Sequence, residues 1–113
     1  MQYLVYDPHF DPQNVATPSP AMMEAVGAYT ALAIRSGIVV ATGGLPPKGT
    51  RLKLENGKFT VTDGPFIELK ELMGGWAILK TSSLDETIEW CKKFREIIGD
   101  GETEIVPIYG PEV

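Results

Sequence analysis

Three carboxylates and one amine fall within the nine residues 63–71 of this 113-residue chain, and together they could move a proton. They are Asp63, Glu68, Lys70 and Glu71. If burial keeps one carboxyl group protonated while another stays ionised near the lysine, the cluster can supply a general acid and a general base. The same residues also fit a structural interpretation. In it, Asp63-Gly64 forms a turn, Phe66 anchors the loop in the core, and the charges are solvated or pair with a partner subunit.

A second candidate for proton transfer is His9, the chain's single histidine. It lies between Asp7 and Asp11, just after a predicted strand, so a carboxylate could hold the imidazole as a titrating base. A lone histidine in a loop is also common as a solvated residue, and both interpretations stay open.

Metal and cofactor sites are not expected from this composition. One histidine and one cysteine are too few for a zinc site. His9 on a loop is a poor axial ligand for haem, and Gly43-Gly44 and Gly74-Gly75 lack the spacing of a phosphate-binding loop. Any reaction is therefore expected to need no cofactor.

Length and charge restrict the class of protein. The chain suits a single domain, residues 1–113, and no apolar run is long enough for a membrane span. The net charge of -5 without a basic stripe disfavours nucleic acids as partners. Cys91 cannot form an internal disulfide and falls in a helical pattern, which favours a cytoplasmic protein.

The pattern of apolar residues and breakers predicts four strands and two helices besides a hairpin. Ser19 and Ser83 are expected helix N-caps, Glu86 completes a capping box with Ser83, and Gly37 and Gly99 are expected helix ends. Residues 42–47 are predicted to bend irregularly. The expected strands are 2–6, 38–41, 75–81 and 104–109, and the expected helices are 20–36 and 84–98, the latter with Leu84, Ile88, Cys91 and Arg95 on its inner face.

Asn56-Gly57 predicts a hairpin over residues 51–62 with a two-residue turn. The turn fixes the register, so that Glu55 opposes Lys58, Leu54 opposes Phe59 and Leu52 opposes Val61. Apolar side chains then share one face of the hairpin.

The order strand, helix, strand, hairpin, strand, helix, strand predicts an α+β fold of ferredoxin-like type, a split β-α-β arrangement with an inserted hairpin. Both helices cover one face of such a sheet. The strands are apolar on both sides, so the other face is expected to need a cover, which a second sheet would supply.

Residues 63–76 match the pattern D-G-P-F-x-E-x-K-E-x-x-G-G-[FW] at every fixed position. The chain therefore resembles the DGPF-motif branch of the YCII-related proteins. The resemblance implies a dimeric α+β barrel, hence a homodimer whose ligand cavity opens at the sheet edge. It also implies site roles, with Asp63 or Glu68 as base, Lys70 tuning the local potential, and Phe66 and Trp76 forming an apolar wall. Glu71 is a further candidate for contact with the substrate. Tyr29 is expected to be a core residue, although its hydroxyl could reach the cavity.

Two functions remain open at this stage. One is a homodimer that binds a small organic molecule between sheet and helices and carries out an acid–base step, which by the resemblance would be of isomerase or lyase type. The other is a non-catalytic ligand sensor or assembly module, in which residues 63–71 build the dimer interface.

Overall fold

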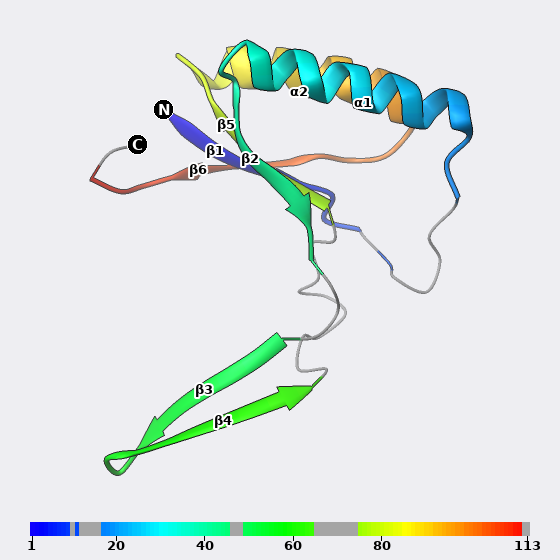
Figure 1. Cartoon of the computed structure of the whole chain (residues 1–113). Helices are drawn as coiled ribbons and strands as arrows, with labels where there is room; N and C mark the ends of the chain where they lie inside the picture. Colours follow the sequence, from blue (N-terminus) through cyan, green and yellow to red (C-terminus); the bar gives the residue numbers. More distant parts are fainter. Residues whose placement is uncertain (10, 12–16, 46–48, 65–74, 112–113) are drawn as a thin grey trace.

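The computed structural model of the chain describes residues 1–9, 11, 17–45, 49–64 and 75–111. Figure 1 shows the helices packed over a sheet, and a hairpin that stands apart from the sheet. In chain order the elements are β1 (Gln2–Tyr6), α1 (Pro20–Arg35), β2 (Val39–Gly44), β3 (Gly49–Glu55), β4 (Lys58–Gly64), β5 (Gly75–Lys80), α2 (Leu84–Ile98) and β6 (Glu104–Ile108).

The sheet has the strand order β2-β5-β1-β6, and each neighbouring pair is antiparallel. Both helices lie on one face of it (Figure 1). This is the split β-α-β topology, so the predicted ferredoxin-like α+β fold is confirmed. Pro107 lies in β6, an edge strand, where a residue without an N–H is tolerated. Among the described residues, no helix is long and apolar enough to cross a bilayer.

Both predicted N-caps are confirmed. The Ser19 hydroxyl accepts from the Met22 N–H at 3.1 Å, and the Ser83 hydroxyl accepts from the Glu86 N–H at 3.1 Å. The Glu86 carboxylate accepts from the N–H of Ser82 at 3.3 Å, one residue before the predicted partner of the capping box. Gly99 ends α2 with φ 95°, a conformation that favours glycine.

Two local predictions were wrong. Residues 42–44 do not bend but continue β2, because they pair with residues 75–77 of β5. The Trp76 ring lies across its cross-strand neighbour Gly43, where a Cβ would meet it at 3.6 Å. Leu84 is 48% exposed and does not belong to the inner face of α2, whereas Thr87 is fully buried there.

The hairpin register is confirmed at each predicted pair, with Asn56 at φ 50° and Gly57 at φ 78° in the turn. The strands run further than predicted. Asp63 pairs with Thr50, whose hydroxyl donates to the Asp63 carboxylate at 2.7 Å, and Gly64 pairs with Gly49. Asp63-Gly64 therefore ends a strand instead of forming the turn of the structural interpretation.

Strand alternation gives the sheet two apolar faces. The face towards the helices carries the buried residues Tyr3 and Leu79, and Ala33 of α1 is buried against this side. On the opposite face, Leu4 lies between its partners Ile78 and Val106, and Ile108 shares that face. These four residues, Leu4, Ile78, Val106 and Ile108, form the bare sheet face, and Val106 is 37% exposed. The predicted need for a cover therefore has a structural basis.

Candidate functional site

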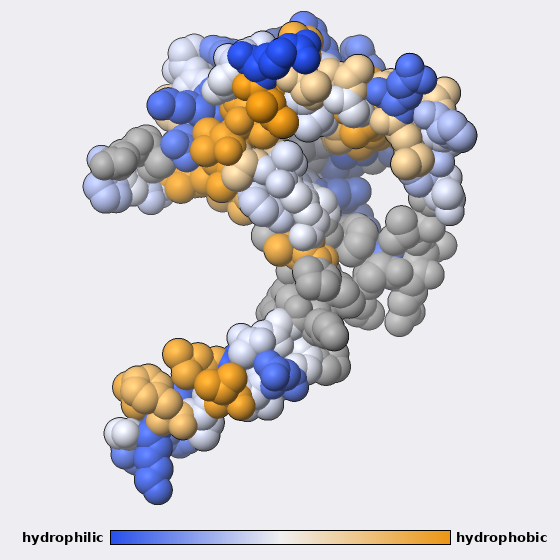
Figure 2. Space-filling view, in the orientation of Figure 1, coloured by the Kyte–Doolittle hydropathy of each residue, from blue (hydrophilic) through white to orange (hydrophobic). Residues whose placement is uncertain are grey.

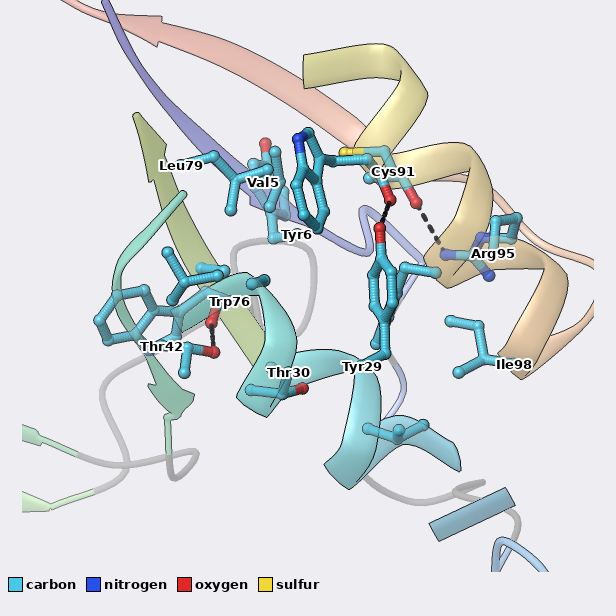
Figure 3. Close-up of a pocket in the computed structure, with 18 of the residues that line it drawn as sticks. Val5, Tyr6, Tyr29, Thr30, Thr42, Trp76, Leu79, Cys91, Arg95 and Ile98 are labelled. Carbon is cyan, nitrogen blue, oxygen red and sulfur yellow. Dashed lines mark hydrogen bonds between the residues drawn. The ribbon is translucent and has the colours of Figure 1, made fainter. Parts of the chain in front are cut away.

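A cavity of about 350 Å³ lies between the sheet and the two helices (Figure 3). This volume suits a small organic molecule, being near the lower end of the range for ligand sites. Most of the lining is apolar or aromatic. From the sheet it includes Val5, Val39, Trp76, Ala77 and Leu79, and from the helices Val26, Tyr29, Ala33, Trp90, Cys91, Phe94 and Ile98.

Aromatic rings hold the helix side of the pocket together. The Tyr29 ring lies 5.7 Å from the Trp90 ring and 6.3 Å from the Phe94 ring, centroid to centroid. The Tyr29 hydroxyl donates to the Trp90 carbonyl oxygen at 2.7 Å. Burial, and secondarily the neighbouring Cys91, raises the pKa of Tyr29. Tyr29 is therefore a neutral donor at physiological pH.

Cys91 lines the pocket as a thiol. Burial raises its pKa to about 11, although the nearby Arg95 cation acts in the opposite direction. At neutral pH the sulfur is protonated and a weak nucleophile. Cys91 therefore contributes apolar surface and a chemical probe of the pocket, in agreement with its predicted place on the inner face of α2.

At one end of the pocket, β5 begins and β2 ends. Gly75 and Trp76 begin β5 there, and Thr42 near the end of β2 donates its hydroxyl to the Trp76 carbonyl oxygen at 2.8 Å. The Trp76 Nε1–H is enclosed and has no acceptor within the described part of the chain. Gly75 directly follows residues 65–74, which carry most of the DGPF motif and lie outside the described residues.

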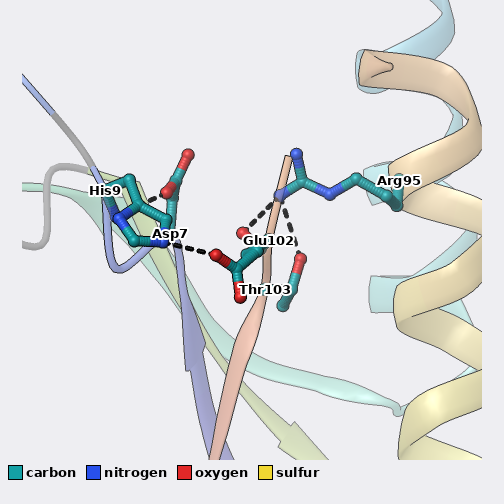
Figure 4. A network of polar contacts seen from close by, with 5 residues as sticks. All are labelled: Asp7, His9, Arg95, Glu102 and Thr103. Atoms are coloured by element: carbon teal, nitrogen blue, oxygen red, sulfur yellow. Dashed lines mark hydrogen bonds and ion pairs between the residues drawn. The ribbon is translucent and has the colours of Figure 1, made fainter. Parts of the chain in front are cut away.

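Five residues form a polar cluster beside the pocket: Asp7, His9, Arg95, Glu102 and Thr103 (Figure 4). The His9 Nε2 atom lies 2.5 Å from a Glu102 carboxylate oxygen. The Asp7 carboxylate accepts from the backbone N–H of His9 at 2.8 Å. Of these five residues, Asp7, Arg95 and Thr103 line the pocket, whereas His9 and Glu102 are exposed beside it. The partner of the His9 ring is Glu102 and not a flanking aspartate, and a catalytic role of His9 stays a prediction.

Arg95 fixes the loop that presents Glu102. One guanidinium nitrogen donates to the Glu102 carbonyl oxygen at 2.9 Å and to the Thr103 hydroxyl at 3.0 Å. The guanidinium also lies against Gly101, where φ is 149° and a Cβ would collide with an Arg95 terminal nitrogen. Within the described ranges, Arg95 forms no ion pair with a carboxylate. Its role here is to shape the loop around residue 102.

A pair of glycine substitutions tests this contact. Gly101→Ala is expected to lower the free energy of unfolding by about 1–3 kcal/mol, because the added Cβ is strained at that φ and displaces Arg95. Gly27→Ala, inside α1 with open space around it, is expected to raise it by up to about 1 kcal/mol. Urea unfolding measures both. Equal effects of the two substitutions would contradict the steric argument.

The structure brings together some of the predicted site residues. Tyr29 and Trp76 line the pocket, and His9 belongs to the adjoining polar cluster. Asp63 is exposed on the hairpin, bonded to Thr50, and is not among the residues that line the pocket. The other four predicted residues, Phe66, Glu68, Lys70 and Glu71, lie outside the described residues.

Sequence reasoning missed Trp90, Phe94, Arg95 and Glu102 as site residues. Trp90 and Phe94 are four residues apart in α2, and this helical spacing could have identified them. Glu102 is 93 residues from His9, and no local pattern links the two. Within the described ranges, no group of three or more histidine, cysteine, aspartate or glutamate side chains could hold a metal ion.

The fold and the pocket define a small α+β protein of ferredoxin-like topology with an apolar cavity under its helices. The chain belongs to the YCII-related domain family, whose family model matches residues 1–110. A search of curated proteins finds no match to the chain.

Proposed function

We propose that this protein is a cytoplasmic homodimer that binds a small, largely apolar organic molecule in the pocket and catalyses a cofactor-free acid–base step of isomerase or lyase type. The observation that carries the proposal is the contact between the apolar cavity and the polar cluster. Asp7, Arg95 and Thr103 belong to both, so a bound molecule would meet polar groups at one end and aromatic rings along its body.

His9 is the described group best suited to accept a proton. When its Nε2–H donates to Glu102, the lone pair lies on Nδ1, and Nδ1 is the atom that would take the proton. Asp7 holds the backbone of His9, and Arg95 holds the backbone at Glu102, so both members of the pair are positioned by lining residues. A proton abstracted from a ligand C–H next to a carbonyl could return to a neighbouring atom, which is an isomerisation.

The motif carboxylates remain part of the proposal. Glu68 and Lys70 come a few residues before Gly75, a lining residue, in the sequence. In this proposal Glu68, with Lys70 beside it, is the second acid–base group, and Phe66 and Glu71 contact the ligand. Asp63 would act as the acid–base group in place of Glu68 only in an assembly that brings the base of the hairpin to the pocket.

Two features support the homodimer and its location. The bare sheet face is apolar and needs a cover, and pairing with a second sheet is the arrangement that the family resemblance implies. The single cysteine is half-buried and free, as is usual in a reducing compartment.

Proton exchange tests the reaction directly. Ligands from a library of small carbonyl compounds would first be found by tryptophan fluorescence, since both tryptophans of the chain line the pocket. Bound ligands are then incubated with enzyme in D₂O, and loss of the ligand C–H signal is followed by proton NMR. We expect exchange that falls by about 100-fold or more in His9→Ala and clearly in Glu102→Gln, with ligand affinity retained.

The control is Lys92→Ala, which removes an exposed ion pair with Glu89 on the outer surface of α2 and should leave exchange unchanged. Exchange that survives in His9→Ala but stops in Glu68→Gln would show that the base is Glu68 of the DGPF motif and not His9. Tight binding without exchange in any ligand would favour the alternative, a ligand-sensing module, over an enzyme.

A further inference from the structure

The hairpin β3–β4 carries an unusual surface for a protein of this size. Its four apolar side chains share one face, with Leu54 opposite Phe59 and Leu52 opposite Val61. They are exposed by 65% (Leu52), 61% (Leu54), 68% (Phe59) and 66% (Val61). These four residues are called the hairpin stripe below. Every residue from Gly49 to Asp63 is exposed, so nothing in the chain's described part covers the stripe.

A two-stranded hairpin alone is marginally stable in water. A hairpin that also exposes a contiguous apolar stripe has a further free-energy cost, which contact with another surface would remove. The opposite face of the same hairpin is polar, with Lys53 opposite Thr60 and Arg51 opposite Thr62. The apolar face of the hairpin is therefore suited to contact with another protein surface, and the polar face is suited to solvent.

The hairpin is placed to reach beyond its own subunit. The radius of gyration of the chain is 16.5 Å, whereas a compact domain of this length has about 13 Å. Figure 2 shows apolar side chains on the hairpin and over the four-stranded sheet on two sides of one hollow. A body that fills this hollow would cover the stripe and the bare sheet face together.

Charge favours a second copy as that body. The hairpin, residues 49–64, has three basic side chains and two acidic ones, a net charge of +1, so the rest of the chain has -6. A positively charged arm is attracted to the acidic body of another copy. The dimensions also agree, because a strand of seven residues is about 23 Å long and four strands span about 19 Å, so one hairpin can cross a whole sheet.

We infer that two copies of this chain exchange their β3–β4 hairpins, each hairpin laying its stripe on the partner subunit. The arrangement is isologous, since the same arm and the same receiving surface occur on both copies, and it closes at two subunits. The inference rests on the proposed homodimer and adds the element that holds it together.

Paired substitutions on the two faces of the hairpin test the exchange. In Leu54→Ser with Phe59→Ser, the dimer dissociation constant measured by sedimentation is expected to rise by at least about 100-fold. In Thr60→Ser with Thr62→Ser, two changes on the polar face that leave the charge of the hairpin unchanged, it is expected to stay within about threefold. Circular dichroism checks that both double variants keep the fold, as expected for exposed positions.

Mixed labelling shows directly which subunit the arm contacts. A sample made from ¹³C-labelled and unlabelled chains is examined by isotope-filtered NOE spectroscopy. We expect intermolecular NOEs from the methyl groups of Leu52, Leu54 and Val61 to unlabelled protein. A dimer that is unaffected by the stripe substitutions and shows only intramolecular NOEs from these methyls would overturn the exchange and leave the homodimer standing. A monomeric wild-type protein at millimolar concentration would overturn both.

Discussion

Ala33→Leu is expected to weaken ligand binding by at least tenfold, which corresponds to about 1.4 kcal/mol of binding free energy. Ala33 is 3% exposed in α1 and lines the pocket, so the added carbons enter space that a ligand would occupy. Stability should change by less than about 1 kcal/mol, because the gain from burying those carbons offsets the crowding beside an open cavity. The loss of affinity would therefore not reflect unfolding.

The matched control is Ala28→Leu, the same change at an exposed position of α1 outside the pocket. It should bind ligand as the wild type does. Cys91 provides a second measurement beside tryptophan fluorescence. With a pKa of about 11, only on the order of one thiol in a thousand is ionised at pH 8, so reaction with a thiol reagent is slow and accelerates as the pH rises.

A ligand in the pocket should slow that reaction further in the wild type and in Ala28→Leu, but not in Ala33→Leu. Unchanged affinity in Ala33→Leu would mean that the ligand binds elsewhere. In that case the pocket would be a packing defect beneath the helices, and the proposed function would lose the observation that carries it.

The features that sequence predicted correctly are those decided within a few residues. Asn56-Gly57 sets the hairpin register because a two-residue turn allows only one pairing, and Ser19 and Ser83 cap helices through N–H groups three residues away. The β2 extension was missed because two glycines suggest a bend by themselves. The cover that the Trp76 ring gives Gly43 comes from a strand more than thirty residues later.

The site was predictable only in part, for the same physical reason. Glu102 reaches His9 because β1 and β6 pair with Tyr6 opposite Glu104, which places the loop after β1 beside the loop before β6. This register depends on the whole sheet. His9 could be predicted as a candidate from its residue type, but no spacing in the sequence predicts Glu102 as its partner.

The largest loss of stability from a single polar group is expected at Thr87, which is fully buried. Its hydroxyl lies 2.6 Å from the Thr81 hydroxyl and 3.1 Å from the Ser83 carbonyl oxygen, at the junction of β5 and α2. Thr87→Val keeps the shape but removes both bonds of the Thr87 hydroxyl, while the Thr81 hydroxyl keeps only its own bond to the Ser83 carbonyl oxygen at 3.0 Å, so the free energy of unfolding should fall by about 1–3 kcal/mol. Thr62→Val on the exposed hairpin is the control and should change it by less than about 0.5 kcal/mol.

The double variant Thr81→Val with Thr87→Val separates bonding from packing. If the two hydroxyls satisfy each other, removing both leaves no unpaired hydroxyl, and the Ser83 carbonyl still accepts from the Thr87 N–H at 3.2 Å. The double variant should then lose less stability than the two single variants together, by about 1 kcal/mol in urea unfolding at one fixed protein concentration. Strictly additive losses would show that the two hydroxyls act independently. The stability of the junction between β5 and α2 would then depend on the Ser83 N-cap instead.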